Sequence, residues 1–229
     1  MFELFTGPGT ITEKVLYLLV YVFALFFSLT IHEYAHSHVA LKEGDVTSKV
    51  MGRHTLNPFK HIDPIGMICL LLLGIGWAKP VPIDSRNFKN GKKSEVKVAL
   101  AGILTNFIVG VCSVFFVALV WAISQGTTFV GTLAYNFIIK LFMSFASFNF
   151  MFAFFNIIPI YPLDGFRLVE TFTKPYNKYV EFMKKYSTII LIVLLLTQVL
   201  YYYISFFAYG TMQGFINLFE FIFTKLGAL

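Results

Sequence analysis

The sequence TIHEYAH at residues 30–36 closes a long apolar run. Because residues i and i+4 share one face of a helix, His32 and His36 can bind a single metal ion. Glu33 lies beside that face, where a general base that activates water would stand. The 17 residues of the range 15–31 carry no charge. The stretch therefore predicts a metal site inside a membrane helix.

The composition of the whole chain supports a membrane location. Of its 229 residues 57% are hydrophobic and only 13% are charged, whereas a soluble domain carries about 25% charged residues. Several apolar runs follow one another, which predicts an all-α polytopic membrane protein with about four to six transmembrane helices. Cys69 and Cys112 both lie in apolar segments, so a disulfide framework is not expected. The net charge of +6 indicates topology rather than nucleic-acid binding.

The apolar runs divide the chain into spans and one shorter segment. Residues 64–78 are apolar but number only about 15 and contain three glycines. Since a span needs about 20 residues, we expect a re-entrant hairpin there, buried in protein or lining a wet cavity. From Met212 the tail forms either an interfacial amphipathic helix or a short final span. We expect one membrane-embedded domain over 1–229, with a core at 15–186 and C-terminal helices at 187–229, and spans at 15–41, 98–124, about 141–158 and 187–209.

The loop charges predict the orientation of these spans. Three segments, 42–63, 79–97 and 161–186, contain 4, 6 and 5 of the 18 Lys and Arg residues. The positive-inside rule places all three in the cytoplasm. The N-terminus is then outside, and the chain is expected in the cell membrane with its metal site toward the cytoplasmic side.

A third metal ligand is predicted near the end of a later span. At 1.5 Å per residue, His32 and Asn106 both lie roughly 12–14 Å from the cytoplasmic ends of their helices. The following span ends with NIIPIYPLDG at residues 156–165, where two prolines and a glycine break the helix and can turn Asp164 toward the interior. Two histidines and a carboxylate, with one position left open, suit one catalytic zinc ion per chain. Glu33 can then take a proton from water and pass it to the leaving amine.

These motifs resemble a known family. The pattern HExxH at 32–36, the pair Gly102 and Asn106, and the 156–165 segment together resemble the site-2 protease family of intramembrane zinc metalloproteases. The stretches LNPFKHIDPIG at 56–66 and GWAKPVP at 76–82 resemble a compact prokaryotic branch. The resemblance covers roughly residues 15–200. No gap in the sequence is long enough for the PDZ domain or the CBS pair that some relatives carry.

The resemblance implies a function and a role for each residue. The activity would be regulated cleavage of a transmembrane protein substrate near the cytoplasmic end of its helix. His32, His36 and Asp164 would hold zinc, and Glu33 would be the general base. Asn106 would position the scissile peptide or stabilise its oxyanion. The hairpin near residues 64–78 would present an edge strand to the substrate.

Two other classes of function remain open. A metal-ion transporter could use two histidines and an aspartate to carry ions, but such proteins often have paired halves with broken helices in corresponding places, and none is seen here. An inactive membrane scaffold of the same fold would be expected to have lost Glu33 or a ligand.

Three other histidines are predicted not to bind the metal: His38, His54 and His61. The oligomeric state is left open.

Overall fold

The structure is a computed structural model, and it describes residues 10–66, 78–174 and 176–226. In these ranges the regular elements are helices, with one isolated antiparallel bridge between Ile62 and Ala78. Within the described residues, three helices are long and apolar enough to cross a membrane: α2 (Ile11–Lys42), α5 (Lys92–Ser124) and α6 (Leu133–Asn156). The pair α8 (Lys178–Leu196) and α9 (Val199–Lys225) forms a fourth span if it is counted as one. The predicted all-α polytopic fold is confirmed. The described residues contain 3 candidate spans, or 4 with the bent pair, whereas about four to six were predicted.

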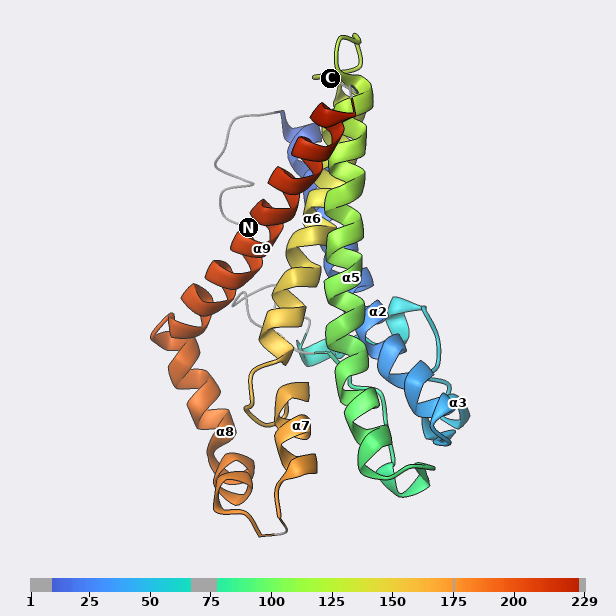
Figure 1. Cartoon of the computed structure of the whole chain (residues 1–229), viewed down its shortest axis with the longest axis vertical. Coiled ribbons are helices and arrows are strands. Elements are labelled where there is room, and N and C mark those ends of the chain that lie inside the picture. Colours follow the sequence, from blue (N-terminus) through green and yellow to red (C-terminus); the bar gives the residue numbers. More distant parts are fainter. Residues whose placement is uncertain (1–9, 67–77, 175, 227–229) are drawn as a thin grey trace.

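Helix α5 is the centre of the bundle and contacts α2, α6, α7 (Asp164–Phe172) and α9 (Figure 1). A Cβ atom added to its Gly110 would lie 2.9 Å from the ring of Phe150 on α6. Glycine therefore allows these two helices to approach closely, as small residues do in membrane bundles. Phe150 also belongs to a buried cluster with Val114, Ala146 and Met212. Through Met212, α9 is packed onto the α5–α6 pair.

The three basic segments lie at one end of the bundle, as their charge predicts. Figure 1 shows α3 (Thr47–Val50), α7 (Asp164–Phe172), α8 and the start of α5 together in its lower part. There Lys97 and Ser94 of α5 both donate hydrogen bonds to Glu43, which ends α2. These contacts, with that of Lys97 first, lower the pKa of Glu43 to about 2. A charged network thus joins the basic ends of α2 and α5.

Short helices occupy parts of the segments that the sequence predicts as loops. Helix α7 and the beginning of α8 lie within 161–186, and α3 and the 3₁₀ turn η1 (Pro58–Lys60) lie within 42–63. A second 3₁₀ turn, η2 (Ser85–Asn87), precedes α5. The centre of the re-entrant hairpin expected at 64–78 lies outside the described residues.

Two predicted spans differ from the helices observed. The span expected at 187–209 is not one helix, because α8 and α9 meet at an angle of 74°. Gln198 between them has a left-handed backbone with φ of 59°, which an α-helix cannot continue through. Helix α6 begins well before residue 141, so Lys140 lies within it. Its Nζ is 5.4 Å from the ring centre of Tyr17 on α2, a cation–π contact.

Candidate metal centre

Three predicted ligands converge at the basic end of the spanning helices. The Nε2 atoms of His32 and His36, one turn apart on α2, are 3.1 Å from each other. The Oδ2 atom of Asp164 lies 3.2 Å from Nε2 of His32 and 3.0 Å from Nε2 of His36. All three side chains are buried. Among the described residues they are the one group of His, Cys, Asp or Glu that could hold a metal ion.

The other ring nitrogen of each histidine fixes its tautomer. Nδ1 of His32 is 2.7 Å from the amide oxygen of Asn106, and Nδ1 of His36 is 2.7 Å from the carbonyl oxygen of Val98. Both oxygens can only accept, so each Nδ1 carries the hydrogen. Each neutral imidazole then presents its Nε2 lone pair to the centre, which is the arrangement that metal-binding histidines use.

A divalent cation fits this cluster. Two Nε2 lone pairs and a carboxylate oxygen face one another with no donor between them, and Oδ2 of Asp164 accepts no hydrogen bond from the described residues although it is buried. Such an arrangement is costly unless a positive charge lies at its centre. Ligands at 2.0–2.2 Å from a tetrahedral zinc are about 3.3 Å apart, close to the separations observed. The donor set and its spacing therefore suit zinc.

Asp164 reaches the histidines because the chain changes direction after α6. Helix α6 ends at Asn156, and Asp164 is the first residue of α7. A Cβ atom on Gly165 would lie 2.1 Å from the carbonyl oxygen of Ile157, so only glycine allows α7 to begin so close to this turn.

Glu33 faces the same centre from α2. It lines a cavity of about 90 Å³ together with the three ligand side chains, and the far wall is formed by Pro80, Val81 and Ile83. Its Oε2 accepts a hydrogen bond of 2.8 Å from the backbone N–H of Val81, and Oε1 has no hydrogen bond from the described residues. The cavity is large enough for water. A carboxylate oxygen is thus left available beside the ligand cluster.

Asn106 lies behind His32 and does not line this cavity. It is fully buried, and its amide nitrogen donates to the carbonyl oxygen of Ser28 and to the side-chain oxygen of Asn149. Asn149 in turn donates to the hydroxyl of Ser28. We call Ser28, Asn106 and Asn149 the polar network; it joins α2, α5 and α6 behind the metal centre.

The sequence alone left Ser28 and Asn149 unrecognised. A signal existed, because Ser28 precedes His32 by one helical turn and Asn149 is a polar residue within an apolar span. The predicted non-ligand histidines lie elsewhere: His38 and His54 stack with Tyr34, and Nε2 of His61 bonds to the carbonyl oxygen of Thr55.

Fold and centre together define a class of protein. It is a multi-pass membrane protein in which two histidines of a spanning helix and an aspartate of α7 could hold a metal ion, with a glutamate beside them. The family model described as "Peptidase family M50" matches residues 20–198, well over half of the chain. The chain therefore belongs to peptidase family M50, the site-2 protease family, and it is a metalloendopeptidase whose family implies zinc.

Two curated relatives are named for the same activity. The chain is 38% identical over 154 residues to the Bacillus subtilis (strain 168) protein named "Putative zinc metalloprotease YwhC", a match that covers 67% of this chain and 69% of that protein. It is 24% identical over 184 residues to the Mycolicibacterium smegmatis protein named "Putative zinc metalloprotease Rip2", covering 76% of this chain and 65% of that protein. No solved structure matches the chain.

Proposed function

We propose that this protein hydrolyses a peptide bond in or near a transmembrane helix of a membrane-protein substrate, on the cytoplasmic side of the cell membrane. One observation carries the proposal: an unpartnered carboxylate oxygen and two histidine lone pairs meet inside a bundle of spanning helices, in a cavity that Glu33 also lines. The three basic segments lie at the same end of the bundle as the metal centre, which supports a cytoplasmic location for that centre.

His32, His36 and Asp164 would hold one zinc ion. When bound there, zinc supplies a Lewis acid that polarises the scissile carbonyl and makes water easier to deprotonate. Glu33 takes the proton of the attacking water on its carboxylate and later delivers it to the leaving amine. The hydrogen bond from Val81 to Oε2 orients this carboxylate, and the burial of the cluster limits access of bulk water.

We propose that Asn106 acts through His32 and does not touch the substrate. Its side-chain oxygen accepts a hydrogen bond from Nδ1 of His32 and so fixes that ring. Its side-chain nitrogen donates hydrogen bonds to Ser28 and Asn149 and is not free for a substrate. Replacing Asn106 with Ala should weaken zinc binding by about 10- to 100-fold, the usual cost of removing a partner that orients a ligand. Competition with a zinc-binding dye would measure this loss in detergent-solubilised protein.

Asn106→Asp is the comparison, because a carboxylate still accepts from Nδ1 of His32, although it loses the hydrogen bonds that the amide nitrogen donates to Ser28 and Asn149. It should retain tighter zinc binding than Asn106→Ala. If Asn106 instead contacted the substrate, both variants would bind zinc as the unmodified protein does and would differ from it in KM or kcat alone.

The proposed function is tested with the protein reconstituted in vesicles. Membrane proteins that accumulate in complex with a Glu33→Gln variant in native membranes would be identified by mass spectrometry and then offered to the unmodified enzyme. We expect cleavage that a chelator abolishes and that about one equivalent of zinc restores. Zinc flux across the vesicle membrane with no cleavage of any trapped protein would favour a transporter instead.

A further inference from the structure

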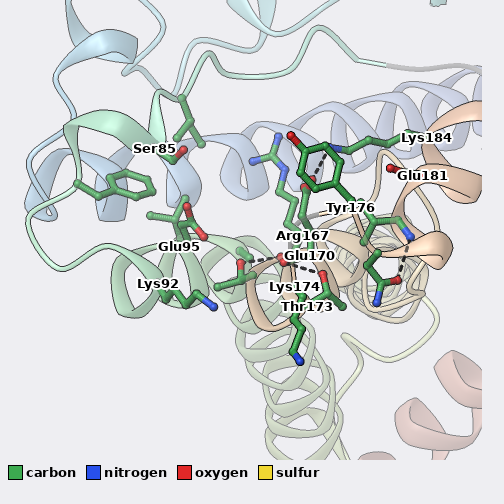
Figure 2. A pocket seen from close by; sticks show the side chains of 17 residues that line it. Ser85, Lys92, Glu95, Arg167, Glu170, Thr173, Lys174, Tyr176, Glu181 and Lys184 are labelled. Atoms are coloured by element: carbon green, nitrogen blue, oxygen red, sulfur yellow. Dashed lines mark hydrogen bonds and ion pairs between the residues drawn. The ribbon is translucent and has the colours of Figure 1, made fainter.

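A second and larger cleft opens beside the metal centre at the basic end of the bundle (Figure 2). Its volume is about 790 Å³, within the range of ligand-binding sites. It is formed by the segment before α5, the first turns of α5, the helix α7 and the start of α8. Two of its lining residues, Ile83 and Arg167, also line the metal cavity. The cleft and the metal centre therefore share a wall.

Arg167 is the charged residue that lines both the cleft and the metal cavity. It follows Asp164 by three residues on α7, so the two side chains lie on neighbouring positions of one helix face. Arg167 is exposed, and no carboxylate among the described residues forms an ion pair with it. A chain that leaves the metal cavity through the cleft would meet this guanidinium first.

The remaining walls of the cleft offer both charge and apolar surface. Figure 2 shows Lys92 and Lys174 on its margins, neither in an ion pair within the described part of the chain, whereas Lys184 is paired with Glu170. Two acids without an ion pair in those residues, Glu95 and Glu181, also line the cleft, so the preference for a carboxylate depends on Arg167 at the junction. Apolar contact is available from the half-buried Ile83, Phe88 and Val180. A groove with apolar walls and a free arginine at one end suits an extended peptide with a carboxylate.

We propose that this cleft binds the cytosolic segment that adjoins the cleaved helix of the substrate, and that Arg167 pairs with an Asp or Glu side chain close to the scissile bond. The inference rests on the proposed function, since it assigns the cleft to the same substrate. Peptide segments at the cytosolic ends of membrane helices are usually basic. An acidic residue at this position would therefore distinguish substrates from most membrane proteins.

Binding can be measured separately from cleavage. The probe is a fluorescent single-span peptide with an Asp-Glu pair in its cytosolic flank, compared with peptides that carry Asn-Gln or Lys-Lys at the same place. Each is titrated with full-length Glu33→Gln protein in zwitterionic vesicles. We expect the acidic peptide to bind about tenfold more tightly than the neutral one. Arg167→Gln should remove that difference, Arg167→Lys should keep part of it, and Arg167→Glu should favour the Lys-Lys peptide.

Lys93→Gln is the matched control, because Lys93 carries the same charge at the same end of the bundle but does not line the cleft. It should leave the preference unchanged. Equal binding of the three peptides would overturn the inference, as would a preference lost equally in Lys93→Gln. An effect of Arg167→Gln that appears only when anionic lipid is added would assign the arginine to a lipid headgroup.

Cleavage assays of the unmodified enzyme separate this inference from the proposed function. If all three peptides are cut at equal rates and bound equally, the cleft assignment fails while the protease assignment stands. If none is cut by the zinc-loaded enzyme although the acidic peptide binds through Arg167, the protease assignment fails while the cleft assignment stands.

Discussion

Glu33→Gln should abolish peptide hydrolysis while zinc remains bound. The amide oxygen of glutamine can still accept the hydrogen bond from Val81, and neither histidine nor Asp164 is altered. The amide cannot take a proton from water, however, so the general-base contribution of about 10²- to 10⁴-fold is lost. The measurements are single-turnover cleavage of a trapped substrate and the zinc content of the purified variant by mass spectrometry.

Glu13→Gln provides the control for this experiment. Glu13 lies on the same helix, where it closes the capping box with Thr10, and glutamine also serves in that motif. The control should cleave at the rate of the unmodified protein. Undiminished cleavage by a zinc-loaded Glu33→Gln variant would mean that another group is the base.

Gly102→Ala should disrupt the metal centre although it adds only one methyl group. A Cβ atom at this position would lie 2.4 Å from Nε2 of His36 and 2.5 Å from Cε1 of His32. Both histidines are already held from behind, by Val98 and by Asn106, so either α5 or the rings must move. We expect zinc affinity to fall by about 10- to 100-fold and cleavage to fall with it.

The matched controls are Gly210→Ala and Gly214→Ala on α9, where a Cβ atom would meet nothing within 4 Å. Alanine in an open helical position favours the helix, so neither change should reduce zinc binding or thermal stability. If the Gly102→Ala protein binds zinc as tightly as the unmodified protein, the added methyl group does not displace the histidines, and this prediction is wrong.

Local spacing was enough to predict that His32, His36 and Asp164 lie together. The i, i+4 pair of histidines and the helix break before Asp164 are properties of short stretches, and the structure brings these residues together. The spans predicted at 15–41 and 98–124 followed from the length of two uninterrupted apolar runs. They lie within α2 (Ile11–Lys42) and α5 (Lys92–Ser124).

Features that depend on contacts between helices could not be predicted. The hydrogen bonds that Asn106 makes with His32, Ser28 and Asn149 depend on how α5 is rotated against α2 and α6, which no single stretch encodes. The break at Gln198 carries no proline or glycine signal, because the left-handed backbone occurs at a glutamine. The junction at Arg167 exists only because α7 lies against the start of α5.

The polar network has a consequence for how the enzyme responds to its lipid environment. A membrane protein meets bilayers of different thickness and can adjust by tilting or by sliding its helices past one another. Sliding α2, α5 or α6 by one turn would separate Ser28, Asn106 and Asn149 in an apolar medium, where unpaired polar groups are costly. The three helices should therefore tilt together, and the geometry of the histidine pair should be the same in thin and thick membranes.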